Sequence, residues 1–504
     1  MKKFNLKSKI LFIYSLALFA SCSDFLDVNQ NPNSPVSENL PLNAKLPAAL
    51  VAVANQEVLQ INQIGGFWGG YWGTNNDGSN QFFDLKTYNG LNIRTQREGI
   101  PVWETGYNNI LYFRLIQKEA EQSGDLFYQG VSKIMQGWLF LRLVDFYNNI
   151  PFDQAAQGSS FLNPAYQPGQ EVYAKSLELI SSGIEDVKSS SVQANLNHGD
   201  ILFKGNKQLW AKFGNTIKLR ALLRQSEKGD RGYISAQLNA IALEGNGFLG
   251  LGELAAVNPG YLNSTGKMNP FWENYYRNVQ GAETTNRQNI RPTEFVISTL
   301  SRLGDPRIQA LYTVTSDGFR GVLFGNPDVG NPIYDRQQTS AFKGPLENNG
   351  QPTGLFHSFG QPLVLLSDFE SLFLQAEAAY RGWLTSSMDE LYQQGIQASF
   401  TYLKVNSGVS TYISGPEVAL SNTPNPLEKI IEQKWLALNS ISSIEAWNDY
   451  RRLGMPAYPA SIASGVQGRP MRLMYPETEL GTNYDEVAKQ GPDRVLVNKV
   501  WWMP

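Results

Sequence analysis

The chain contains a single cysteine, Cys22, so no disulfide can form within it. Its stability must come from side-chain packing, and 42% of its residues are hydrophobic, an ordinary share that provides a core. A chain of 504 residues has room for about three domains of average size. We nevertheless expect residues 42–504 to form one large domain, because single domains reach this size.

The segment before Cys22 has the three parts of a bacterial export signal. Lysines at positions 2, 3, 7 and 9 precede an apolar run over 10–19, and two small residues follow it. This run is too short to span a bilayer with polar flanks on both sides. We therefore predict a signal peptide over 1–21.

A cysteine directly after two small residues resembles a lipobox, in which the thiol is acylated and becomes the new N-terminus. Phe19 stands where a lipobox usually has leucine. Two or three acyl chains hold a protein stably on a membrane. The residues SDFLD at 23–27 resemble signals that send lipoproteins to the outer face of the outer membrane. We expect Cys22 to be the lipid anchor and 22–41, rich in Asn, Pro and Ser, to be its tether.

The composition of the chain favours an uncharged polar ligand. The formal net charge is −3 and the basic residues are dispersed, which argues against a nucleic-acid surface. Only 17% of residues are charged, whereas 12% are aromatic. After Cys22 no stretch is long and apolar enough to cross a membrane. Rings combined with asparagine and glycine suit ligands such as sugars.

Apolar residues at helical spacing predict a mainly helical fold built from paired helices. The expected helices cover 42–64, 103–121, 126–147, 171–188, 207–227, 368–383, 388–405, 427–438 and 444–453. Small residues share one face of the helix at 368–383. Paired helices with such faces indicate stacked helical hairpins of the tetratricopeptide type.

Residues 245–362 are rich in Gly, Pro, Asn and Tyr, with 291–302 as the best helix among them. A long irregular segment within a folded protein is usually functional. GNGFLG at 245–250 matches a dinucleotide fingerprint, but it follows an expected helix at 233–243 rather than a strand. We interpret it as a helix C-cap and a turn. The glycine-rich 260–267 lacks the spacing and hydroxyl of a phosphate loop.

The sequence offers little material for catalysis. It has two histidines, His198 and His357, so a histidine-based metal site or triad is not expected. Glu445 and Asp449 share a helix face, and neighbouring arginines favour an ion-pair cluster over an acid/base pair. NNDG at 75–78 lacks the closing glutamate of a calcium loop and indicates a turn. We expect no cofactor, no metal and no enzymatic activity.

Several segments resemble the SusD/RagB family of surface lipoproteins, which capture nutrients, mostly glycans. The matching segments are DFYNNIPF at 145–152, 200–224, VNPGY at 257–261, KMNP at 267–270, DPR at 305–307, 367–383, 447–452, RLMYPE at 472–477 and WW at 501–502. The NPGY and KMNP elements are most similar to the starch-binding-associated branch. Asn148 replaces the usual glycine of the family's D-x-Y-G turn, and asparagine tolerates left-handed backbone.

The resemblance implies a tetratricopeptide-like scaffold with an excursion, 245–362, that carries the ligand surface. It also implies a partner, a SusC-like TonB-dependent β-barrel transporter, and an outer-membrane location facing the cell exterior. The family binds its ligands and hands them over without catalysis. A peptide-capturing lid of the same fold and a surface glycosidase are the alternatives.

No family motif carries the binding residues, so the chemistry of sugar recognition selects the candidates. Rings stack on the C–H faces of sugars, while amides and carboxylates bind their hydroxyls. The glycine-rich segment 65–73 carries four rings, which are either core or displayed, because glycines at this density do not hold a helix or strand. The first candidates are Trp68, Tyr71, Trp72, Asn75, Asn76 and Asp77; the second are Trp272, Tyr275, Tyr276 and Arg277.

Overall fold

The computed structural model describes residues 40–77, 81–192, 199–327, 332–463 and 465–504. The predicted signal peptide, Cys22 and all but the end of the tether lie outside the described residues, as does His198. Within the described residues no helix is long and apolar enough to cross a membrane.

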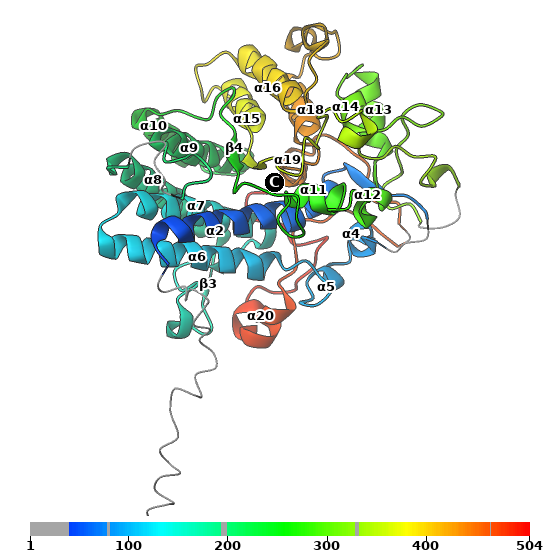
Figure 1. Cartoon of the computed structure of the whole chain (residues 1–504). Helices are drawn as coiled ribbons and strands as arrows, with labels where there is room; N and C mark the ends of the chain where they lie inside the picture. The colour runs from blue at the N-terminus through cyan, green and yellow to red at the C-terminus, as the bar shows by residue number, and fades with distance from the viewer. Residues whose placement is uncertain (1–39, 78–80, 193–198, 328–331, 464) are drawn as a thin grey trace, which may run out of the picture.

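The predicted helical pairs are confirmed and form the scaffold (Figure 1). They are α6 (Val102–Ser123) with α7 (Leu126–Tyr147), α8 (Gly169–Ser189) with α9 (Lys207–Arg224), α15 (Asp368–Tyr380) with α16 (Met388–Tyr402), and α18 (Pro426–Leu438) with α19 (Ile444–Leu453). The break between α6 and α7 follows from local chemistry. Gly124 ends α6 with φ 72°, and the Asp125 carboxylate accepts hydrogen bonds from Phe127 N and Tyr128 N.

Close approaches between neighbouring helices depend on glycine. A Cβ on Gly130 of α7 would lie 2.5 Å from the carbonyl oxygen of Gly183 on α8, and a Cβ on Gly183 would lie 2.6 Å from Gly130 O. The reciprocal pair lets the two helices pack against each other over their length. Glycines therefore set how closely α7 and α8 approach each other.

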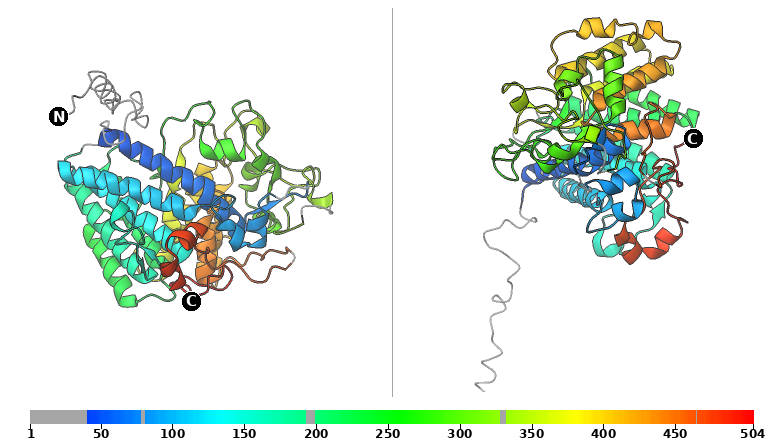
Figure 2. Two further views of the ribbon diagram at one scale, coloured as in Figure 1. Left: turned by 90° about the horizontal axis from the view of Figure 1, so that it is seen from below. Right: turned by 90° about the vertical axis from the view of Figure 1, so that its right-hand side faces the viewer.

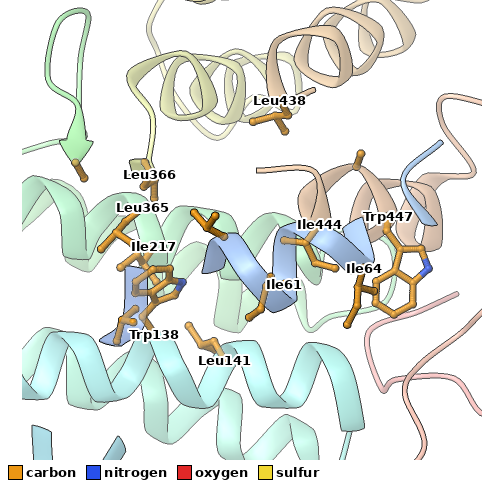
Figure 3. Close-up of a cluster of buried hydrophobic side chains, with 14 of the residues drawn as sticks. Ile61, Ile64, Trp138, Leu141, Ile217, Leu365, Leu366, Leu438, Ile444 and Trp447 are labelled. Carbon is orange, nitrogen blue, oxygen red and sulfur yellow. The ribbon is translucent and has the colours of Figure 1, made fainter. Parts of the chain in front are cut away.

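The first helix is interrupted rather than continuous over 42–64. It divides into α2 (Leu42–Gln56), the π-helical turn η3 (Glu57–Ile61) and α3 (Asn62–Trp68). The expectation that the glycines at 65 and 66 exclude a helix is wrong, since both lie within α3. A Cβ on Gly65 would meet the backbone nitrogen of Ile444 at 2.1 Å, so the glycine permits contact between α3 and α19. Figure 3 shows these helices meeting in the apolar core.

The region 245–362 is loop-rich, as predicted, and its helices α12, α13 and α14 lie on the right of Figure 1. Its elements are β4 (Ala255–Val257), α11 (Pro270–Tyr275), α12 (Thr285–Asn289), β5 (Ile290–Pro292), α13 (Glu294–Arg302), α14 (Ile308–Leu311), η5 (Pro332–Tyr334) and η6 (Pro345–Glu347). The helix before it, α10 (Arg231–Glu244), ends at Gly245 with φ 87°. The interpretation of this glycine as a C-cap is therefore confirmed.

Three short antiparallel ribbons supplement the helices. β1 (Trp72–Thr74) pairs with β5, β2 (Ile150–Pro151) with β3 (Tyr166–Gln167), and β4 with β6 (Leu363–Leu366). Strands of two to four residues are too short to show an alternating pattern, so the sequence did not predict them. The fold remains mainly helical, as expected.

The remaining elements are short and lie at the edges of the scaffold (Figure 2). They are α4 (Phe83–Thr87), α5 (Gly90–Ile93), η4 (Gly158–Ser160), α17 (Val409–Ile413), η7 (Leu420–Asn422), α20 (Glu477–Thr482) and α21 (Tyr484–Ala488). At the predicted 145–152 turn, Asn148 has φ 72° and its side-chain oxygen accepts a hydrogen bond from Trp501 N at 2.7 Å. Asparagine thus replaces glycine and also holds the C-terminal segment.

The prediction of an ion-pair cluster at Glu445 and Asp449 is confirmed. The Glu445 carboxylate, fully buried, contacts the guanidinium groups of Arg142 and Arg224 and lies 3.5 Å from that of Arg220. These arginines come from α7 and α9, so one carboxylate joins three helices. On the same face of α19, Asp449 pairs with Lys434 at 2.8 Å.

Candidate functional site

The first three predicted rings belong to the core. Trp68 is 2% exposed, and Tyr71 and Trp72 are fully buried. Their polar atoms have protein partners: Trp68 Nε1 donates to Leu85 O, Tyr71 OH to Trp435 O, and Trp72 Nε1 to Ser440 Oγ. The prediction that these rings are displayed to a ligand is therefore wrong. Trp68 packs against Trp447 of α19, Tyr71 stacks on Trp435 of α18, and Trp72 packs against two rings of the excursion.

The second set of rings is also mostly internal. Tyr275 and Tyr276 are buried, whereas Trp272 and Arg277 are partly exposed. Tyr276 OH donates to Glu347 Oε2 at 2.7 Å, and Arg277 pairs with the other oxygen of that carboxylate. Burial alone would raise the pKa of the Glu347 carboxyl, but the hydrogen bonds from Tyr276 and Arg277 hold that pKa below its usual value. Glu347 thus fixes the end of α11 rather than leaving its rings free.

The structure brings the two predicted segments together. β1 and β5 pair with Trp72 opposite Pro292 and Thr74 opposite Ile290. The rings of Trp72 and Tyr275 are 5.2 Å apart between centroids. The two segments therefore form one surface, although their large rings lie beneath it.

Asn75 and Asn76 act as supports. Both are buried, at 1% and 7% exposure. Asn75 Nδ2 donates to Gln288 O at 2.6 Å, and the backbone nitrogen of Asn76 donates to Tyr334 O at 3.2 Å. The prediction that their amides face a ligand is wrong, because they join the end of β1 to α12 and η5.

An accessible polar cluster lies where the ribbon ends, and it consists of Asp77, Gln288 and Arg336. The Asp77 carboxylate accepts from Arg336 N at 3.2 Å and pairs with Arg336 Nε at 2.9 Å. Arg336 Nη1 donates to Gln288 Oε1 at 3.3 Å. The side chains of Asp77 and Arg336 are 29% and 41% exposed. We call these three residues the ribbon-end cluster.

A buried arginine supports this cluster from below. Arg291, 1% exposed, donates to Thr339 Oγ1 at 2.8 Å and to Arg336 O at 3.3 Å. Burial, together with the positive charges of Arg287 and Arg336, lowers the pKa of Arg291 to about 9. Arg291 therefore fixes the backbone from which Arg336 projects.

An exposed ring lies on α4, a helix that is bonded to the ribbon whose end carries the cluster. Gln81 Oε1 accepts a hydrogen bond from Asn289 Nδ2 at 2.8 Å, and Lys86 Nζ donates to Thr74 Oγ1 at 2.9 Å. These bonds hold α4 against the β1–β5 ribbon. Phe83, the first residue of α4, is 49% exposed. Unlike Trp68 and Trp72, this ring is accessible to solvent.

Sequence reasoning identified Asp77 and missed Arg336, Gln288 and Phe83. Phe83 follows the glycine-rich segment 65–73, and its local pattern gives no sign of exposure. Arg336 is 259 residues from Asp77 along the chain, and no motif connects the two.

The described residues contain no group of three or more His, Cys, Asp or Glu side chains arranged to hold a metal ion. Burial, with a smaller contribution from the charge of Lys404, lowers the pKa of His357. This histidine lies beside the ring of Tyr402.

Helical hairpins of the tetratricopeptide type with a loop-rich excursion define the SusD class of folds. The sequence model of the SusD-like_2 family, described as starch-binding and associating with the outer membrane, matches residues 46–476. The chain therefore belongs to this family. No curated protein sequence matches it.

Solved structures agree in fold. A SusD homologue from Bacteroides fragilis superimposes with a TM-score of 0.72 at 20% identity, over 91% of this chain and 98% of its own. A chitin-binding SusD homologue from Flavobacterium johnsoniae gives 0.71 at 22% identity, over 90% and 98%. A further chitin-binding protein gives 0.73 at 21% identity, over 92% and 100%. At these sequence identities the structural similarity shows the fold alone.

Proposed function

We propose that the protein is a surface lipoprotein that captures oligosaccharides or polysaccharides at the ribbon-end cluster. The observation that carries the proposal is an accessible carboxylate and amide that both contact one guanidinium, with an exposed ring on a helix that is bonded to the same ribbon. Membership of a family described as starch-binding supports it. So do the chitin-binding relatives of the same fold.

The cluster has the hydrogen-bonding groups that a sugar requires. The Asp77 carboxylate accepts from hydroxyl groups, Arg336 donates, and the Gln288 amide does both. Hydrogen bonds to charged groups are stronger than neutral ones. Phe83 offers an apolar face for the C–H side of a pyranose ring. Trp272 and Arg277, partly exposed at the end of α11, remain predicted contacts for a longer chain.

The cluster favours binding without hydrolysis. Glycoside hydrolysis requires two carboxylates on opposite sides of the scissile bond. The ribbon-end cluster supplies one, Asp77, and Arg336 is paired with it. We therefore infer a binding protein rather than a glycosidase, and a peptide ligand is the alternative that a binding panel would reveal.

Replacing Arg336 with alanine is expected to weaken glycan binding about tenfold to a hundredfold, because a charged hydrogen bond contributes about 1.5–3 kcal/mol. Affinity electrophoresis and calorimetry with soluble starch and chitin oligosaccharides measure this change. Arg302→Ala is the matched control, since Arg302 is an exposed guanidinium paired with Glu417 at 3.1 Å. Equal affinities for the two variants would place the glycan elsewhere.

The family resemblance supports two further parts of the proposal. The lipoprotein would be anchored to the outer membrane through Cys22 and would face the cell exterior. It would pass its ligand to a SusC-like TonB-dependent transporter that it covers as a lid.

Changing Cys22 to alanine is expected to release the protein from the outer-membrane fraction, because the acyl chains that hold it there attach to this thiol. Membrane fractionation and labelling with a fatty-acid analogue measure the effect. Phe19→Leu, which restores the usual lipobox residue, should keep both retention and label. A Cys22→Ala protein that stays labelled and membrane-bound would contradict the anchor.

A further inference from the structure

A separate cavity opens between the N-terminal turn of α13, residues 322–324 and residues 458–462. Its volume is about 250 Å³. The lining consists of Gly70, Thr293, Glu294, Phe295, Ser298, Val322, Leu323, Phe324, Tyr458, Pro459, Ala460 and Ile462. We call it the Phe295 cavity. It is smaller than the 300–1,000 Å³ of a usual ligand pocket, so its size fits a single ring.

Two aromatic rings form walls of this cavity. The rings of Phe295 and Tyr458 are 6.5 Å apart between centroids at an interplanar angle of 65°. The polar atoms on these walls already have partners, since Tyr458 OH donates to Trp68 O at 2.7 Å and Thr293 Oγ1 to Gly70 O at 2.6 Å. A ligand in the cavity therefore meets apolar surface from two rings that lie at an angle to each other.

The polar group of the cavity is a carboxylate. Glu294, the first residue of α13, is exposed, and its side chain forms a hydrogen bond with the Tyr334 hydroxyl. Besides Tyr458 it is the one ionisable side chain among the lining residues. A carboxylate accepts hydroxyl hydrogen bonds and repels an anion.

Tyr334 connects this cavity to the ribbon-end cluster. Its hydroxyl reaches Glu294, and its carbonyl oxygen accepts from the Asn76 backbone 3.2 Å away. Arg336 follows two residues later and pairs with Asp77. One residue therefore contacts both Glu294 of the cavity and Asn76, the neighbour of Asp77 in the cluster.

We propose that the Phe295 cavity binds one neutral sugar residue of the captured glycan and excludes acidic sugars. This inference rests on the proposed glycan-binding function and adds the class of sugar. The apolar face of the sugar lies against Phe295 and Tyr458, and its hydroxyls donate to Glu294. A uronic acid or a sulfated sugar would bring a second negative charge against Glu294.

Ser298→Trp tests the cavity, because Ser298 is an exposed lining residue on α13 and a tryptophan there would fill the opening. The probes are methyl glycosides of glucose, galactose and N-acetylglucosamine, with methyl glucuronide as the acidic counterpart. Saturation-transfer NMR on the full chain measures binding. We expect signals from at least one neutral glycoside and none from the glucuronide, with a loss of at least tenfold in Ser298→Trp.

Ser301→Trp is the matched control, since Ser301 is exposed one turn later on the same helix and does not line the cavity. It should bind as the unmodified protein does. If Ser298→Trp does not fold, Glu294→Gln replaces it, and this variant should bind the neutral glycoside about tenfold more weakly and admit the glucuronide.

Any one of three results would overturn the inference. They are unchanged binding by both test variants, glucuronide binding equal to that of the neutral probe, and no signal from any neutral glycoside. A failure of this inference can be told apart from a failure of the proposed function, because the proposed function is tested by the loss of polysaccharide affinity in Arg336→Ala. If Arg336→Ala loses that affinity while Ser298→Trp binds unchanged, the proposed function stands and the Phe295 cavity is not a sugar site.

Discussion

Replacing Glu445 with alanine is expected to lower the free energy of unfolding by about 3–5 kcal/mol. The carboxylate is fully buried among Arg142, Arg220 and Arg224, and its removal leaves like charges in the interior. Arg142 keeps Glu57, Arg220 keeps Glu370 and Arg224 keeps Asp145, so the cost arises from three buried guanidinium groups that each lose one of two carboxylate partners. Urea denaturation followed by circular dichroism measures the difference.

Glu417→Ala provides the control, because Glu417 pairs with Arg302 at an exposed position. An exposed pair contributes about 0–1 kcal/mol, so this variant should unfold almost as the unmodified protein does. A similar loss of unfolding free energy in both variants would show that burial of Glu445 does not increase the cost of removing its carboxylate.

The same variant should also change the response to acid. Burial opposes ionisation, but the charges of Arg224, Arg220 and Arg142 hold the pKa of Glu445 well below its usual value. A lowered pKa in the folded state means that the stabilisation is present above pH 4.5 and is lost as the pH falls further. Glu445→Ala should therefore lose less stability than the unmodified protein between neutral pH and pH 3.

The helices were predictable because their signals are local. α7 and α19 begin and end where the sequence predicts, and Asp125 and Gly124 provide the caps that set the break before α7. The exception at Gly65 has a physical cause. Whether glycines break a helix or allow it to approach another depends on Ile444, which is remote in the sequence.

The site was less predictable because it depends on contacts between distant segments. The sequence identified the segment that carries β1 and, within it, Asp77, whereas β5 lies outside the predicted segment at 272–277. It could not tell displayed rings from buried ones, since Trp72 is covered by Tyr275 and Phe342 from the excursion. Arg336 becomes a candidate only when η5 places it beside Asp77.

Replacing Trp72 with alanine is expected to cost about 3–5 kcal/mol of stability, the usual cost of removing a buried tryptophan side chain. Trp72 is fully buried and packs against the rings of Phe67, Tyr275 and Phe342. Its Nε1 also donates to Ser440 Oγ at 2.8 Å, so truncation removes a buried hydrogen bond and leaves that hydroxyl only its bond to Asn439 Oδ1. Thermal melts and urea denaturation measure the loss.

Phe83→Ala is the matched aromatic control for this prediction. Because Phe83 is 49% exposed, its truncation should change stability by less than about 0.5 kcal/mol. Its effect should fall on glycan affinity instead, whereas Trp72→Ala protein that remains folded should bind as before. A Trp72→Ala variant that melts normally but binds glycan weakly would show that Trp72 contacts the ligand, and would contradict its burial in the core.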